Sequence, residues 1–335
     1  MTSSHLSGSE SETIRATSWK QILKWSIRLI VLLLVGWGIL QTWHDAFEKF
    51  TSHQFRILDL RPLWLLASAA FYFLAMLPMA AFWHRVLWSM DQRPTWSETF
   101  SAHCTGQLGK YVPGKAMVVL LRATLIRSDR VDGVAAGIGV FVETLSVMAI
   151  GACVAAGILA FHADHLAMVV LAVCLALLAG IPVFPPIMKR IIWFLRLKKL
   201  GLSADSLLAR FTLKQLAPGW FGLVVSWWLI GLSLWAVIAA MPQGPTAIES
   251  IGDWPLLTAC AALAMVAGFL SLLPAGILVR EYVVMALLAS HPDYGPLVAI
   301  VSAVVLRLTW LLTELITAAV CYGYLRFRRF PRQEG

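Results

Sequence analysis

Long apolar runs alternate with short polar segments along the chain. Most of these runs approach or exceed the roughly 20 residues that an α-helix needs to cross the hydrocarbon core of a bilayer. The pattern therefore predicts an all-α, polytopic membrane helical bundle. The predicted full spans are 22–43, 63–83, 133–161, 166–182, 220–241 and 297–325.

Two further stretches are broken by proline and glycine, which interrupt a regular helix. The first has arms at 97–108 and 116–126 around Gly109-Lys-Tyr-Val-Pro-Gly-Lys115. Each arm is too short to cross, so we expect a re-entrant hairpin. The second has arms at 254–273 and 277–289 around Pro274-Ala-Gly276. It is either a second hairpin, which gives six full spans, or two short crossings, which give eight.

Each half of the chain thus contains a broken segment followed by a long span that carries charge. Broken backbone at membrane depth must be buried in protein or line a wet cavity. If both segments are re-entrant, they enter from opposite faces of the membrane. This arrangement indicates a possible inverted repeat whose halves meet near the midplane.

Composition excludes an ordinary soluble domain. Hydrophobic residues make up 59%, charged residues only 13%, and the mean hydropathy is +0.76, against roughly 25% charged residues in typical soluble chains. The net charge of +9 comes from basic residues beside apolar runs, which indicates topology signals and contacts to anionic lipid rather than nucleic acid. The basic segments at both ends predict cytoplasmic N and C termini.

The domain organisation follows from the same pattern. Residues 1–18 are polar and predict a disordered tail, 19–327 form the transmembrane domain, and 328–335 form a basic C-terminal tail. The segment 189–214 is basic with interleaved aliphatic and aromatic residues, which is typical of an interfacial amphipathic segment. None of the five cysteines forms a Cys-x-x-Cys pair, so we expect free thiols.

Charged residues inside the apolar segments are the main candidates for function. A charge at the centre of a membrane helix costs about 2.5–3.5 kcal/mol, so it faces the protein interior and has a partner. We expect a net cationic cavity that binds a phosphate-bearing head group. The alternative is a set of buried ion pairs that only fix helix packing. The candidate binding residues are Lys110, Pro113, Gly114, Lys115, Arg122, Glu143, Pro274, Gly276, Arg280, Glu281, Arg307 and Glu314.

Two motifs with acidic or histidine side chains are weaker candidates for a metal site. His162-Ala-Asp-His165 lies in a short turn with no further ligand nearby, and Asp129-Arg-Val-Asp132 has no second acidic cluster. There is no phosphate-binding Gly-Lys-Ser/Thr loop. We therefore expect no metal and no cofactor.

At the broken segments the chain resembles the flippase-like family that includes the transmembrane region of lysylphosphatidylglycerol synthases. The resemblance rests on Gly109–Lys115, on Glu143, on Pro274-Ala-Gly-Ile-Leu-Val-Arg-Glu281 and on Arg307, and it extends from about residue 20 to 325. The second motif has Ala275 and Leu278 where the family tends to have glycine.

The resemblance implies a bacterial inner-membrane protein that moves a lipid between leaflets, such as an aminoacyl-phospholipid, a lipid-linked sugar or a hopanoid-like lipid. It does not favour synthesis, because no soluble aminoacyl-transferase segment follows the spans. Two alternatives are an intramembrane transferase with Glu143 or Glu281 as general base, and a non-catalytic subunit of a lipid or glycan synthesis complex. The expected partners are the lipid substrate, the bilayer, and a synthesis enzyme or a second copy of the chain, but no nucleic acid.

Overall fold

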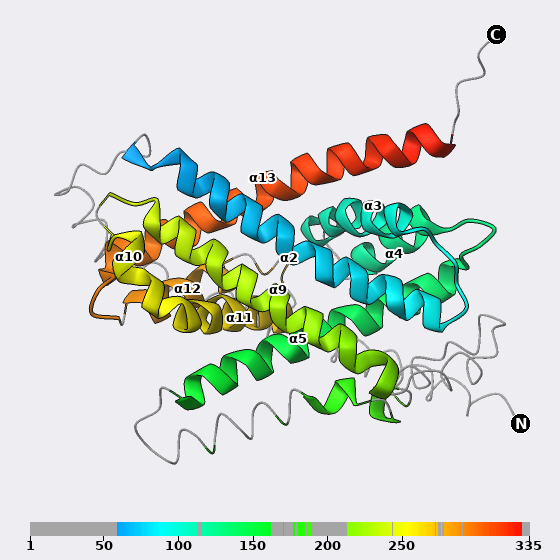
Figure 1. The fold of residues 1–335 in the computed structure, drawn as a ribbon, viewed down its shortest axis with the longest axis horizontal. Helices are drawn as coiled ribbons and strands as arrows, with labels where there is room; N and C mark the ends of the chain where they lie inside the picture. Colours follow the sequence, from blue (N-terminus) through cyan, green and yellow to red (C-terminus); the bar gives the residue numbers. More distant parts are fainter. Residues whose placement is uncertain are drawn as a thin grey trace, which may run out of the picture. The chain divides into compact units, whose positions relative to one another are not determined.

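The computed structural model describes the parts of the chain that contain both broken segments. These residues are 59–112, 116–161, 170, 177, 180–184, 186–188, 190, 213–242, 244–271, 273, 276, 278–289 and 291–329. They all belong to one compact unit, His53–Gly335. Within them the regular elements are helices (Figure 1), apart from one isolated bridge between Ser128 and Val131.

Five helical stretches are long and apolar enough to cross a membrane among the residues described. This confirms the prediction of a polytopic helical bundle. They are α2 (Pro62–Ser89), α5 (Gly133–Phe161), α9 (Leu213–Ala239), α13 (Gly295–Arg329), and α11 (Trp254–Leu270) with the short α10 (Ala247–Ser250) and η5 (Ile251–Asp253) before it. The predicted spans 22–43 and 166–182 and the basic segment 189–214 fall wholly or mostly outside the described residues, although a short 3-10 helix, η3, occupies Ile181–Val183.

The prediction for α9 placed its start too late. The helix begins at Leu213, seven residues before the predicted position 220. Lys214 and Pro218 resemble a loop in sequence, but tertiary contacts continue the helix through them. Arg85 Nε donates to the backbone oxygen of Gln215 across 2.7 Å, and Gly219 lies directly against the ring of Phe82.

The first broken segment forms α3 (Trp96–Gln107), η2 (Leu108–Tyr111) and α4 (Ala116–Ile126). A capping box begins α3: Thr95 Oγ1 accepts from the backbone N–H of Glu98, and the Glu98 carboxylate accepts from that of Thr95. A Cβ at Gly109 would lie 2.8 Å from the Val118 backbone nitrogen. Glycine there lets the two arms approach closely.

The second broken segment forms α11 and α12 (Val279–Ala289). The chain between them passes through left-handed backbone at Gly276 (φ 64°) and Leu278 (φ 71°). Glycine adopts this conformation at no steric cost, whereas leucine does not. The α11 stretch from Ala247 is long enough to cross a membrane, while α12 has 11 residues.

Helices α2 and α9 run antiparallel along their whole length. The backbone N–H of Arg61 donates to Ala240 across 2.9 Å at one end, and Ser68 Oγ donates to the Ser233 carbonyl across 2.8 Å further along. Each hairpin follows the C-terminal end of one of these helices. The two hairpins therefore begin at opposite ends of the α2–α9 pair (Figure 1).

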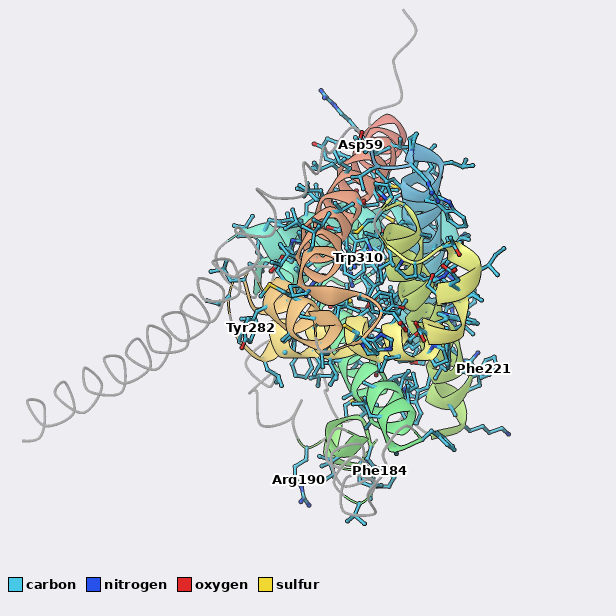
Figure 2. All side chains as sticks on the ribbon, turned by 90° about the vertical axis from the view of Figure 1, so that its left-hand side faces the viewer. Asp59, Phe184, Arg190, Phe221, Tyr282 and Trp310 are labelled. Atoms are coloured by element: carbon cyan, nitrogen blue, oxygen red, sulfur yellow. The ribbon has the colours of Figure 1, made fainter. Side chains whose placement is uncertain are left out.

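The packing of the two halves is equivalent. The first arm of each hairpin packs against the long helix of the other half, α3 on α13 and α11 on α5. This is the arrangement expected of the inverted repeat. Aromatic residues are distributed between core and periphery, with Trp310 in the interior and Phe221, 73% exposed, at the edge of the bundle (Figure 2).

Candidate functional site

A cavity of about 320 Å³ lies between the two hairpins. Apolar side chains cover much of its wall, including Met76, Met148 and Phe269. Polar side chains enter it from both halves of the chain. They are Tyr72, Gln107, Lys110, Arg122, Glu143, Thr144 and Arg280.

Arg122 on α4 is bound to Glu143 on α5. Arg122 Nη1 lies 2.8 Å from Glu143 Oε2, and the two side chains are only 2% and 4% exposed. The Thr144 hydroxyl donates to the same carboxylate across 3.3 Å. Arg122 packs over Trp83, with 5.6 Å from its Cζ to the ring centroid. Its charge is therefore neutralised within the first half.

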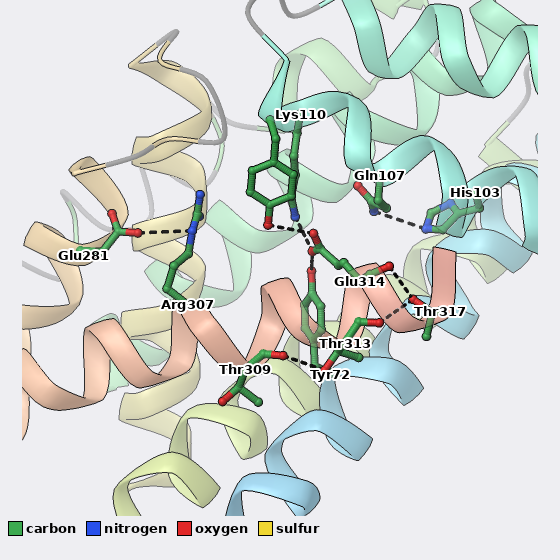
Figure 3. Close-up of polar contacts among 11 residues, drawn as sticks. Tyr72, His103, Gln107, Lys110, Glu281, Arg307, Thr309, Thr313, Glu314 and Thr317 are labelled. Carbon is green, nitrogen blue, oxygen red and sulfur yellow. Dashed lines mark hydrogen bonds and ion pairs between the residues drawn. The ribbon is translucent and has the colours of Figure 1, made fainter. Parts of the chain in front are cut away.

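Glu314 on α13 collects three donors from the other half. Lys110 Nζ and the Tyr72 hydroxyl both contact Glu314 Oε1 (Figure 3), and the Tyr111 hydroxyl donates to Oε2 across 2.9 Å. Glu314 has no exposed surface. Tyr72 is held by Trp310, which stacks on it with ring centroids 4.7 Å apart. The cluster joins the first hairpin to α2 and α13.

A third pair, Arg307 and Glu281, joins α13 to α12. Arg307 Nε lies 3.5 Å from Glu281 Oε1 (Figure 3). Both residues line a small cavity of about 20 Å³ beside the larger one. Glu281 Oε2 is buried without a hydrogen-bond partner in the described part of the chain.

Arg280 stands between the two cavities and lines both. Its Nε and Nη1 atoms are buried and have no hydrogen-bond partner among the residues described. Two glycines make room for the side chain: a Cβ at Gly268 would lie 2.7 Å from Arg280 Nε, and one at Gly276 would lie 2.9 Å from it. A buried guanidinium without a partner is costly, so this geometry calls for an acceptor from outside the protein.

The structure brings many of the sequence-predicted residues together. Lys110, Arg122, Glu143, Gly276 and Arg280 line the main cavity. Glu281 and Arg307 line the neighbouring small cavity, and Glu314 lies behind Lys110. Pro113, Gly114, Lys115 and Pro274 lie outside the described residues.

Sequence reasoning missed the tyrosines and one glycine. Tyr72 and Tyr111 bind Glu314, and Gly268 makes space for Arg280. A tyrosine in an apolar run is typical of a core residue or of a membrane-interface aromatic, so the sequence around Tyr72 did not indicate a polar site. The sequence did offer an indication for Tyr111, because this residue lies inside the motif that connects the arms of the first hairpin.

Two groups bear on metal binding. Asp132 caps α5, since its Oδ1 accepts from the backbone N–H of Val134 and Ala135 at 2.9 Å. Elsewhere, ligand atoms of Asp253, His291 and Asp293 lie within 4.8 Å of one another, although Asp253 already accepts the Tyr294 hydroxyl at 2.6 Å. The three come from the start of α11 and the loop before α13, so the sequence did not suggest the group.

Fold and site together define a multi-pass helical membrane protein with a polar cavity between two broken-helix hairpins. The family comparison agrees with this class. Residues 25–318 match the family described as lysylphosphatidylglycerol synthase TM region, and the chain belongs to that family. It is therefore a membrane protein with a lipid-related role. No curated protein matches the chain.

Proposed function

We propose that the protein moves a lipid with an anionic head group between the two leaflets of the membrane. The head group occupies the cavity between the hairpins while the acyl chains stay in the bilayer. A volume of about 320 Å³ is at the lower end of the roughly 300–1,000 Å³ typical of ligand pockets. That space suits a head group and is too small for a whole phospholipid.

Arg280 carries the proposal. Among the described residues around the cavity, Lys110 faces Glu314, Arg122 faces Glu143, and Arg307 faces Glu281. The Arg280 Nε and Nη1 atoms are buried and have no acceptor among the residues that the structure describes. A phosphate oxygen would supply that acceptor through a charge-assisted hydrogen bond.

The same argument narrows the substrate. Aminoacyl-phospholipids and lipid-linked sugars both carry phosphate, so either satisfies Arg280. A hopanoid-like lipid without phosphate would leave the guanidinium unpaired, so we favour the phosphate-bearing classes. The basic segments favour an orientation with both termini in the cytoplasm, and the family favours a bacterial inner membrane.

A transferase has weaker support. Glu143 already accepts hydrogen bonds from Arg122 and Thr144, and a carboxylate engaged in this way is a poor general base. Glu281 Oε2 has no hydrogen-bond partner in the described segments, but the small cavity beside it leaves little space for two substrates.

Purified protein in liposomes with head-group-labelled anionic lipid tests the proposal. We expect leaflet exchange with wild type, loss of exchange with Arg280→Ala, and partial recovery with Arg280→Lys. Arg93→Ala is the matched control. Arg93 is an exposed arginine that does not line the cavity, and its Nη2 lies 3.5 Å from Asp91 Oδ1. Exchange that survives Arg280→Ala would contradict the proposed site, and a new covalent lipid product without exchange would favour the transferase.

A further inference from the structure

A stripe of polar side chains follows one face of α3. Thr99, His103 and Gln107 recur every four residues, and side chains at this spacing are neighbours on a helix. Lys110 continues the stripe into η2. Thr99 and His103 have no exposed surface. Burying such groups in a membrane protein is unfavourable unless they have partners or water.

The hairpin architecture does not require this polarity. Helix α11 is the equivalent first arm in the other half, and Thr258 is its only residue with a hydroxyl group. It contains no histidine, amide or charged side chain. The stripe therefore occurs in one half of the protein only, which indicates a functional role rather than a requirement of helix packing.

Contacts link the stripe from the end of α2 to the centre of the protein. His84 is half-buried near the end of α2, and its Nδ1 lies 2.8 Å from Thr99 Oγ1. His103 Nε2 lies 3.5 Å from Gln107 Nε2 (Figure 3), and Gln107 lines the main cavity. The cavity in turn exposes Lys110, which binds Glu314.

Several buried polar atoms beside the stripe have no hydrogen-bond partner within the described ranges. The Arg122 guanidinium packs over Trp83, whose ring centroid is 6.4 Å from that of His103. Polar atoms that lack protein partners in an interior are generally served by buried water. The unpartnered atoms are Trp83 Nε1, His103 Nδ1 and Arg122 Nε.

We propose that this stripe is a hydrated proton path from His84 to Glu314, which couples head-group movement to protons. The inference rests on the proposed function. Histidine suits the role because its ring accepts a proton on one nitrogen and releases one from the other. His103 has Nε2 toward Gln107 and Nδ1 free for water. The proton passes from His84 through Thr99, whose hydroxyl turns from the Thr95 carbonyl at 3.1 Å to water, and on to His103. It then passes through cavity water to Lys110, which lines the cavity and transfers a proton to the Glu314 carboxylate that it contacts.

Protonation of Glu314 changes what Lys110 can bind. The carboxylate becomes neutral, so the Lys110 ammonium loses its counterion and can face a phosphate in the cavity that it lines. One proton then accompanies one negative charge on the lipid, which makes the transfer electroneutral. The groups around His103 are Arg122 on α4, Lys110 on η2, Glu143 behind Arg122, and the Cys321 thiol of α13 beside Cys104. Around Glu314 they are Tyr72, Cys104, Lys110, Tyr111 and Arg280.

Liposomes with a trapped pH-sensitive dye and head-group-labelled anionic lipid test the coupling. We expect wild-type lipid exchange to follow an imposed pH gradient and to carry protons, with no response to membrane potential. His103→Gln keeps a hydrogen-bonding side chain but cannot carry a proton. We expect proton movement to fall by about a hundredfold, the lower end of what a positioned proton carrier contributes, and exchange to lose its dependence on the gradient.

Thr99→Val and Thr258→Val form a matched pair, since both remove a buried hydroxyl from the first arm of a hairpin. Only the first should slow proton movement. If His103→Gln does not fold, the Thr99 variant and slower wild-type exchange in D2O still decide the matter. Exchange that depends on Arg280 but ignores both the gradient and His103→Gln would overturn the proton path and leave the proposed function standing. A wild type that moves no lipid would overturn the proposed function and the inference with it.

Discussion

Arg122 Nη1 lies 2.8 Å from Glu143 Oε2, with both side chains almost completely buried between the first hairpin and α5. The pair places two opposite charges where bulk water does not compensate for the loss of either. Taking both charges out of water offsets most of their attraction. The pair therefore matters less for its net stability than for the cost of leaving one member alone.

Removing only one member should be strongly destabilising. We expect Arg122→Met or Glu143→Leu alone to lower the free energy of unfolding by about 3–5 kcal/mol, because each leaves a buried charge without its partner. The double variant should recover much of that loss. Unfolding in detergent of wild type, both single variants and the double variant measures the coupling. Additive losses would contradict the account of the pair.

The space around Arg280 depends on glycine. A Cβ at Gly268 would lie 2.7 Å from Arg280 Nε, so Gly268→Ala should displace the guanidinium. We expect the Kd for an anionic lipid to rise at least about tenfold, which corresponds to roughly 1.4 kcal/mol. Binding of labelled lipid to purified protein in detergent measures the change.

Gly157→Ala is the matched control for that experiment. Gly157 also lies in a long apolar helix, α5, but a Cβ there would meet nothing within 4 Å. It should leave lipid binding unchanged. Equal effects of the two substitutions would show that alanine acts through the helix backbone and not through Arg280.

The hydroxyl of Tyr72 should contribute to stability through Glu314. Tyr72→Phe keeps the stacking on Trp310 but removes one of three donors to a buried carboxylate. We expect a loss of about 1.5–3 kcal/mol, the range for a hydrogen bond to a charged group. Tyr282→Phe on α12 is the control, since its hydroxyl has no hydrogen bond in the described segments. Thermal unfolding of the two variants measures the loss. Equal shifts in Tm would rule out the hydrogen bond to Glu314 as its cause.

Helix positions could be predicted where sequence signals and packing agree. The arms of the first hairpin were predicted at 97–108 and 116–126, and the helices occupy Trp96–Gln107 and Ala116–Ile126. Thr95 with Glu98 and the Pro113-Gly114 break mark these ends in the sequence itself. The start of α9 could not be predicted, because it depends on contacts with α2, over a hundred residues away in the chain.

The charges of the site were predictable, but their pairing was not. The cost of burial indicated that each of these charges has a partner, and Arg307 and Glu314 do have partners, Glu281 and Lys110. Which cation meets which carboxylate depends on the fold, since Lys110 and Glu314 are 204 residues apart. That Arg280 lacks an acceptor among the described residues could be recognised only from the structure, because it depends on where each of its described neighbours lies.

The loop before α13 should make stability depend on alkaline pH through Tyr294. Burial first, and then the hydrogen bond to Asp253 Oδ2 at 2.6 Å, raise the pKa of Tyr294 above its usual value. The unfolded chain therefore loses this proton near pH 10 while the folded chain still holds it. As pH rises above about 10, the contribution of Tyr294 to the free energy of unfolding falls. Tyr294→Phe should be less stable than wild type at pH 8 and should lose less stability between pH 9 and about 11, as measured by denaturant unfolding. Tyr322→Phe, at an exposed tyrosine, should follow wild type at every pH, and a Tyr294→Phe curve parallel to wild type would contradict the prediction.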